Sequence, residues 1–172
     1  YSNPAIVHTY DAAGTYTVTI TGMISGWSFA DVNNMDPAGL SDPKKLLSVS
    51  SWGTLAFGPT AGQLYDTSNL SITATDAPDL SATTSLQSAF MSSSSLSSVP
   101  SMADWDTSTI TNMQMTFGGA TNFNTDIGSW DTSNVTTMAG MFQLTAFNQD
   151  ISGWETGNVT DMSGMFGGAN GF

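Results

Sequence analysis

The chain has 172 residues and a formal net charge of -12, and Lys44 and Lys45 are its only basic side chains apart from His8. Nucleic acid phosphates and anionic lipid headgroups are both bound by clusters of Lys and Arg, so the charge excludes these two kinds of partner. The absence of cysteine excludes disulfides and thiolate metal sites, and a lone histidine excludes His-based triads and zinc motifs. No apolar run is long enough to predict insertion into a membrane.

The composition indicates a folded chain rich in strands and turns. It includes 24 Ser and 24 Thr, and 40% of the residues are hydrophobic, five of them Trp. Disordered segments combine high charge with few aromatic residues, which is the opposite pattern. Lys and Glu, which favour helices, are scarce, whereas Thr and Val suit strands. We therefore expect short strands, tight turns and little regular helix.

Residues 1–43 predict a β cap followed by a connecting loop. Residues 15–21 alternate threonine with the larger side chains Tyr16, Val18 and Ile20, which is the period-2 pattern of a strand. This stretch resembles the last hairpin of a polycystic-kidney-disease (PKD) type β-sandwich. We expect an N-terminal β hairpin that covers the first coil of the repeats described next.

The strongest signal in the chain is an internal repeat. Three similar copies begin at Trp105, Trp130 and Trp154, and the middle copy reads Trp-Asp-Thr-Ser-Asn-Val-Thr-Thr-Met. Two aromatic side chains follow each copy at nearly constant distances: Phe117 and Phe123, Phe142 and Phe147, Phe166 and Phe172.

A fainter version of the repeat extends upstream. Residues 65–70 echo the Trp-Asp-Thr-Ser-Asn-Val run, and residues 86–90 echo 113–117. One apolar position recurs every 24 to 27 residues, at Leu46, Leu70, Leu96, Phe123, Phe147 and Phe172. A fixed apolar register predicts that each repeat forms one coil and buries its side chains against the next. We predict about five coils over residues 44–172.

Within one coil we expect a strand, a turn, a short helical segment and another turn. Residues 147–151 carry apolar side chains at both ends of a short run, which favours a strand. Val159, Met162 and Phe166 follow a helical or 3₁₀ spacing over barely two turns.

The run Phe-Asn-x-Asp-Ile-x-x-Trp-Asp-Thr-Ser-Asn-Val-Thr-x-Met-x-x-Met-Phe resembles the repeat of BspA-like leucine-rich-repeat surface proteins of bacteria. The resemblance is close over residues 105–172 and recognisable from about residue 44. It implies an α+β, leucine-rich-repeat-like right-handed solenoid with parallel strands and short helical or 3₁₀ turns. It also implies a secreted or cell-surface protein whose role is adhesion or partner binding. Thr109, Met115 and Glu155 depart from the repeat, so we expect a less regular ladder in their coils.

Acidic side chains recur at fixed positions of the repeat. Asp126 and Asp150 are equivalent, as are Asp106, Asp131 and Glu155, so stacked coils would form two columns with neighbours about 5 Å apart. These side chains either close turns by accepting backbone N–H bonds, which we favour, or form a calcium ladder from Asp126, Asp150, Asp131 and Glu155. Glycosidase chemistry is disfavoured because the acids repeat and do not form one pair across a cleft. We assign no catalytic or cofactor-binding residue.

Three other repeated residue types each allow two interpretations. The Trp column is either a sugar-stacking surface or, as we favour, part of the core. Asn69, Asn134 and Asn158 begin N-glycosylation sequons at what we take to be one repeat position, and we favour a ladder of turn-forming Asn. We expect the paired methionines to fill gaps in the core: Met113 and Met115, Met138 and Met141, Met162 and Met165.

Two threonine columns also follow from the repeat: Thr107, Thr132 and Thr156, then Thr111, Thr136 and Thr160. Flat threonine arrays are known from ice-binding solenoids. The coil length varies between 24 and 27 residues, which we expect to disturb the lattice that such binding requires.

The repeats and the missing catalytic side chains favour a non-catalytic binding or adhesion module that recognises a protein or glycan on another cell. The candidate surface residues are Asn124, Asp126, Asn148, Asp150, Thr132 and Thr156. The alternative is structural, with copies assembling into an extracellular filament or surface layer. Phe172 stands where another coil would open, so we expect the chain to continue there or a neighbouring copy to cover this end.

Overall fold

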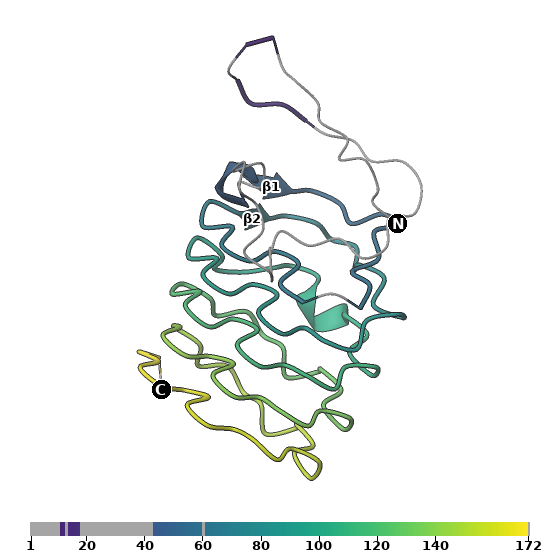
Figure 1. Ribbon diagram of the computed structural model, residues 1–172, viewed down its shortest axis with the longest axis vertical. Coiled ribbons are helices and arrows are strands. Elements are labelled where there is room, and N and C mark those ends of the chain that lie inside the picture. Colours follow the sequence, from purple (N-terminus) through teal and green to yellow (C-terminus); the bar gives the residue numbers. More distant parts are fainter. Residues whose placement is uncertain (1–10, 13, 18–42, 60, 172) are drawn as a thin grey trace, which may run out of the picture.

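The fold comes from a computed structural model, which describes residues 11–12, 14–17, 43–59 and 61–171 (Figure 1). Regular elements in these residues are few and short: the 3₁₀ helices η1 (Pro43–Lys45) and η2 (Met102–Asp104), and the strands β1 (Ser48–Val49) and β2 (Ser71–Ile72). The two strands pair in parallel. None of the described helices has the length and apolar character to cross a membrane. The expected N-terminal hairpin lies almost entirely outside the described residues.

From β1 onward the chain runs through successive coils that lie one on the next (Figure 1). Neighbouring coils are joined by parallel backbone bridges. One column of single bridges passes through equivalent residues of four coils: Ser85, Asn112, Thr137 and Asp161. Residues 86–90 lie in register with 113–117, as predicted, because Phe90 N donates to Thr116 O at 2.8 Å. Each repeat therefore keeps its equivalent residues in straight columns.

Beside these bridges, a second ladder is built from turns. Between Met113 and Gly119 every other N–H donates to a carbonyl of the following coil at 2.8 to 3.0 Å. Of the N–H groups between them, those of Thr116 and Gly118 bond to carbonyls three residues earlier. The alternation goes with a left-handed backbone at two positions per coil, four residues apart. The pairs with positive φ are Gly62 and Asp66, Ser88 and Ser92, Met115 and Gly119, Gly140 and Leu144, Gly164 and Gly168.

Two local predictions of secondary structure are wrong. Residues 159–166 form no helix: Asp161 makes a single parallel bridge, and only residues 163–166 form turns, in which the left-handed Gly164 (φ 61°) interrupts a helical path. Residues 147–151 form neither a strand nor a bridge. There Asn148 N bonds to the side-chain Oδ1 of Asn124, so a side chain replaces the carbonyl that a regular ladder would use.

The upstream echo at residues 65–70 has a different register from the predicted one. Asp66 N donates to Met91 O at 2.8 Å, which places this segment beside residues 91–96 in the turn ladder and away from the Trp position. Its likeness to the Trp-Asp-Thr-Ser-Asn run is local only. Asn69 therefore does not share the column of the two later sequons.

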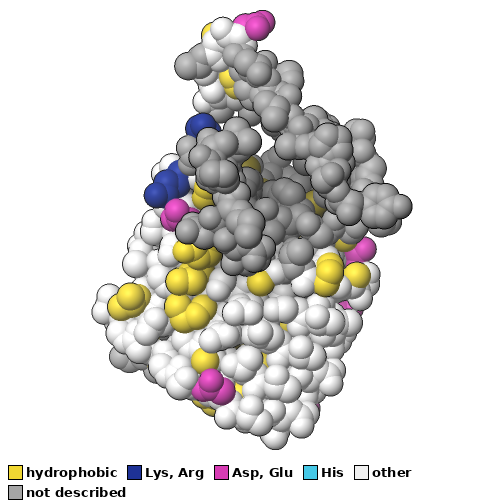
Figure 2. Space-filling model, viewed as in Figure 1, with side chains coloured by type: hydrophobic (Ala, Val, Ile, Leu, Met, Phe, Trp, Pro, Cys, Tyr) yellow, Lys and Arg dark blue, Asp and Glu magenta, His cyan; other side chains and the backbone are white. Residues whose placement is uncertain are grey.

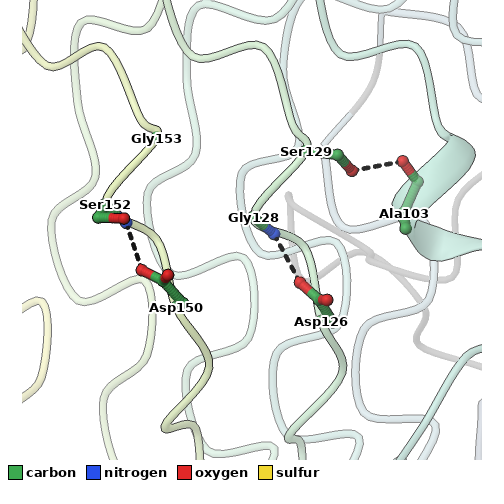
Figure 3. A pocket seen from close by; sticks show the side chains of 7 residues that line it. All are labelled: Ala103, Asp126, Gly128, Ser129, Asp150, Ser152 and Gly153. Atoms are coloured by element: carbon green, nitrogen blue, oxygen red, sulfur yellow. Dashed lines mark hydrogen bonds between the residues drawn. The ribbon is translucent and has the colours of Figure 1, made fainter.

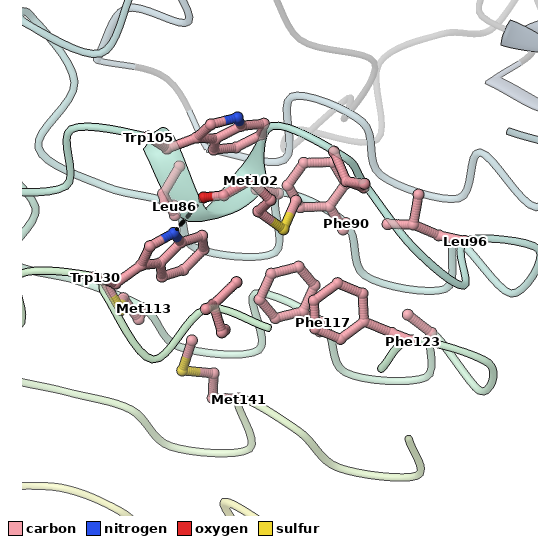
Figure 4. Packing of buried hydrophobic residues seen from close by; sticks show 14 of the residues in the cluster. Leu86, Phe90, Leu96, Met102, Trp105, Met113, Phe117, Phe123, Trp130 and Met141 are labelled. Atoms are coloured by element: carbon pink, nitrogen blue, oxygen red, sulfur yellow. Dashed lines mark hydrogen bonds between the residues drawn. The ribbon is translucent and has the colours of Figure 1, made fainter. Parts of the chain in front are cut away.

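The core is a continuous column of aromatic and aliphatic side chains (Figure 4). Phe117 stacks on Phe123 of its own coil, with ring centroids 3.8 Å apart, and on Phe142 of the next coil at 5.9 Å. Trp130 Nε1 donates to Met102 O in η2 at 2.7 Å. The three repeat tryptophans are buried, which confirms that the Trp column belongs to the core: Trp105, Trp130 and Trp154.

The methionines divide into two groups. Met113, Met138 and Met141 are fully buried and Met165 nearly so, which confirms them as core residues. The core prediction is wrong for Met115, which is half-buried, and for Met162, which is 41% exposed. Met115 lies over glycines of its own and the next coil, and no further described coil covers Met162.

Candidate binding hollow

The candidate site is an open hollow on the side of three successive coils, which we call the Asp126 hollow (Figure 3). Its volume is about 340 Å³. Its lining includes two of the predicted surface residues, Asp126 and Asp150, and the full set is Ala103, Asp126, Gly128, Ser129, Asp150, Ser152 and Gly153.

The hollow exists because the repeat places small residues at this point. Ala103, Gly128 and Ser152 all stand two residues before the Trp of their copy. A Cβ on Gly128 would lie 2.5 Å from the carbonyl oxygen of Asp150, so the close approach of the next coil admits only glycine. Ser129 Oγ donates to Ala103 O at 2.7 Å and ties two coils together. The floor is thus largely fixed backbone.

The two carboxylates of the hollow are exposed and held by their own turns. Asp126 Oδ1 accepts a bond from Gly128 N at 3.0 Å, and Asp150 Oδ1 accepts one from Ser152 N at 2.9 Å. The bonds from the Ser152 backbone and side chain hold the pKa of Asp150 below its ordinary value. Asp150 is therefore ionised at neutral pH, and the hollow carries negative charge.

The second acidic column closes turns in the predicted way. Asp106 and Asp131 each accept bonds from the hydroxyl and the N–H of the serine two residues later, at 2.6 to 3.1 Å. These bonds lower the pKa of both carboxyl groups, and the charge of Asp131 partly opposes the lowering at Asp106. Glu155, in the following coil, is exposed.

The calcium ladder considered from the sequence is not formed. Among the residues that the structure describes, no three acidic or histidine side chains lie close enough together to hold a metal ion. Calcium needs several oxygen ligands around one point. Three of the four carboxylates instead accept a bond from the N–H two residues ahead of them: Asp126, Asp131 and Asp150. Glu155 is not part of any cluster of metal-ligand side chains among the described residues.

Thr132 is a wrong choice of surface residue. Its side chain is 1% exposed, and its Oγ1 donates to Glu155 O of the next coil at 3.0 Å. Thr107 is buried in the same way, with its Oγ1 donating to Asp131 O. Thr156 is exposed, because no described coil lies over it.

The asparagines mostly join coils. Asn124 Oδ1 accepts bonds from Asn148 N and from Gln149 Nε2, both at 3.0 Å, while the Asn148 residue itself is exposed. Asn134 Nδ2 donates to Ser108 O at 2.9 Å, and Asn158 Nδ2 makes the same bond to the preceding coil at 2.7 Å. The last two are the asparagine ladder that the sequons predicted.

The small residues of the floor were not among the predicted site residues, because they carry no reactive group. Their role in the hollow is to leave space: Gly128, Ser129, Ser152 and Gly153. The sequence does contain a pattern that indicates this space, because the position two residues before each repeat Trp holds only Ala, Gly or Ser.

Comparison with known proteins places the chain in a family. No curated protein and no solved structure matches it. A family profile matches residues 61–172, well over half of the chain, and carries the description "Mycoplasma protein of unknown function, DUF285". That family is related to BspA-like surface repeat proteins. The matched segment contains every residue of the Asp126 hollow, and the chain belongs to the DUF285 family.

Proposed function

We propose that the protein is an extracellular or cell-surface binding module that recognises a protein or a glycan without catalysis. The observation that carries the proposal is the Asp126 hollow, in which two exposed carboxylates stand over a floor of small residues. The relation of the family to surface repeat proteins supports this location and role. We take the stacked coils to be a leucine-rich-repeat-like, right-handed solenoid that serves as a rigid frame.

The chemistry of the hollow favours a ligand rich in hydrogen-bond donors. Ionised carboxylates accept bonds from sugar hydroxyls and form stronger ones with ammonium or guanidinium groups. Gly128, which has no side chain, and the small Ser152 let a ligand approach the backbone closely. The net charge of -12 attracts cationic partners and repels anionic ones.

An array of glycans and purified surface proteins tests this function. The wild-type chain is expected to bind a subset of the array, and the double variant Asp126→Asn, Asp150→Asn is expected to lose that binding. Asp161→Asn is the matched control, because Asp161 is also exposed and closes a turn through Ser163 N at 2.9 Å but lies outside the hollow. A silent array with folded wild-type protein would overturn the proposal, as would equal losses in both variants.

A second candidate function is assembly into a filament or surface layer. Met162 is 41% exposed, whereas the equivalent Met138 is fully buried beneath the next coil. An exposed apolar side chain of this kind favours contact with a neighbouring copy that would cover it. Electron microscopy of concentrated protein should then show filaments that Met162→Lys removes. Leu144→Lys is the control, since Leu144 is 54% exposed on an internal coil. Dispersed particles in the wild type would argue against assembly.

A further inference from the structure

Each of four coils presents an outward pair of side chains around one inward residue. In three of them the inward residue is apolar, as in Thr109-Ile110-Thr111, where Ile110 is fully buried and both threonines are exposed. Equivalent pairs recur along the stack, and together they form what we call the threonine grid: Ala82 and Thr84, Thr109 and Thr111, Asn134 and Thr136, Asn158 and Thr160.

The grid is straight because its backbone is in continuous register. Thr111 N donates to Thr84 O at 2.9 Å. In the next two coils, Thr136 N donates to Thr111 O and Thr160 N donates to Thr136 O, both at 2.8 Å. Neighbouring threonines are therefore spaced as neighbouring strands, about 4.8 Å apart. The coil lengths that were expected to disturb the lattice do not break this register, so the extra residues are accommodated elsewhere in the coils.

Side-chain hydrogen bonds also fix the grid. The Oγ1 atoms of Thr111, Thr136 and Thr160 donate to the preceding threonine carbonyls at 3.0 to 3.1 Å. In the neighbouring column, Thr109 Oγ1 and Asn134 Nδ2 donate to carbonyls of the preceding coil at 2.7 and 2.9 Å. Because the hydroxyl protons are used internally, each oxygen keeps acceptor capacity and little rotational freedom.

The grid carries no charge, although the chain as a whole has a net charge of -12. Its eight residues are Ala, Thr and Asn, and all eight are exposed. The acidic columns of Asp106 and of the Asp126 hollow belong to other positions of the coil. Figure 2 shows one face of the molecule, on which white atoms of uncharged polar side chains and backbone cover most of the described surface and acidic side chains are few.

We propose that the threonine grid is an ice-binding surface. Ice differs from other ligands in being a fixed lattice of hydrogen-bonding oxygen atoms, so adsorption favours a receptor that is rigid, uncharged and equally periodic. Methyl groups and acceptor oxygens at a constant spacing match such a lattice in one direction, and the column of Thr109, Asn134 and Asn158 adds a second direction. The inference does not depend on the Asp126 hollow and stands if the proposed function fails.

Thermal hysteresis, the gap between the melting and freezing points of ice in a protein solution, tests the proposal. The wild-type chain is expected to show hysteresis and to inhibit ice recrystallisation. Thr136→Tyr places a bulky side chain in the middle of the grid and is expected to abolish most of the effect. Thr121→Tyr is the matched control, because Thr121 is exposed but lies outside the grid, and it should leave hysteresis unchanged.

The folded state of each variant is checked by circular dichroism and thermal unfolding, and Asn134→Tyr is a second substitution in the grid should Thr136→Tyr not fold. Absence of hysteresis in folded wild-type protein overturns the proposal, as does an equal loss in the Thr121 control. Binding to insoluble cellulose or chitin through Thr136 without any hysteresis would also overturn it, in favour of a crystalline polysaccharide.

Discussion

The thioether of Met115 occupies the space that a side chain on Gly140 would need. The Met115 sulfur is the atom nearest to the Cβ position of Gly140, well within contact distance. The two residues occupy the same left-handed position in consecutive coils, with φ of 54° and 63°. Leu144 lies over Gly168 in the same manner, one coil further along. A side chain at a strained position is thus accommodated by a glycine in the next coil.

This relationship predicts a large cost for Gly140→Ala. The substitution adds a methyl group at a left-handed residue and displaces Met115, so we expect the free energy of unfolding to fall by about 2 to 4 kcal/mol. Gly53→Ala is the control, because Gly53 has φ 55° but nothing within 4 Å of its Cβ position. Its cost should be only the backbone strain, about 1 kcal/mol. Urea denaturation measures both, and equal losses would contradict the packing argument.

The period of the fold could be predicted because the repeat is carried by large side chains. Trp130 and Phe117 must be buried somewhere, and only stacking of successive copies buries all of them. The hydrogen-bond register agrees with this period over residues 86–169. The same period holds at residues 65–70, where Asp66 N bonds to Met91 O. What was wrong there was the alignment, because six similar residues suggested a Trp position that the apolar phase did not support.

The turn ladder and the hollow could not be predicted, for two different reasons. Left-handed positions are recognised from glycine, but Ser88, Met115 and Leu144 occupy them here. The helical spacing of Val159 and Phe166 was therefore misleading. A chain that alternates between right-handed and left-handed backbone positions can turn side chains at this spacing toward the core without forming a helix. The hollow depends on the close approach of Gly128 to the next coil, which no local pattern encodes.

A buried hydroxyl without a partner predicts a stabilising substitution. Thr83 is fully buried, and its Oγ1 has no hydrogen-bond partner among the described residues. Ile110, Val135 and Val159 hold the equivalent position in later coils. Thr83→Val should therefore raise the free energy of unfolding by about 1 kcal/mol, because it removes an unsatisfied polar group at nearly constant volume.

Thr116→Val provides the comparison for Thr83. Thr116 is equally buried, but its Oγ1 donates to Met113 O at 2.8 Å and lies 3.1 Å from Leu86 O. Its replacement should lower the free energy of unfolding by about 1 kcal/mol. The same direction of change in both variants would show that the Thr83 hydroxyl is in fact satisfied.

Asp76 should make the stability of the first coils depend on pH. Its carboxylate accepts bonds from Trp52 N, Gly53 N and Ser51 Oγ at 2.7 to 3.0 Å, and these lower its pKa to about 2. An unfolded Asp has a pKa of about 3.9. The contribution of Asp76 to the free energy of unfolding is therefore complete above about pH 3.9 and is lost as the pH falls toward 2.

The melting temperatures of wild type and Asp76→Asn, measured from pH 7 to pH 2, test this dependence. The wild type should melt at the higher temperature near neutral pH, and the difference should close as the pH falls through the range of about 4 to 2. A difference that stays constant over this range would show that the charge of Asp76 does not act through these bonds.

Two tryptophans that are equally buried should differ in what their indole N–H contributes. Trp105 and Trp130 are both 3% exposed, but Trp130 Nε1 donates to Met102 O at 2.7 Å, whereas Trp105 Nε1 has no partner among the described residues. Replacement by Phe removes similar volume at both positions. Trp130→Phe also removes a hydrogen bond, so it should cost about 1 kcal/mol more than Trp105→Phe in urea denaturation. A larger loss for Trp105→Phe would mean that ring packing against Trp52, with centroids 5.7 Å apart, outweighs the hydrogen bond in the stability of these coils.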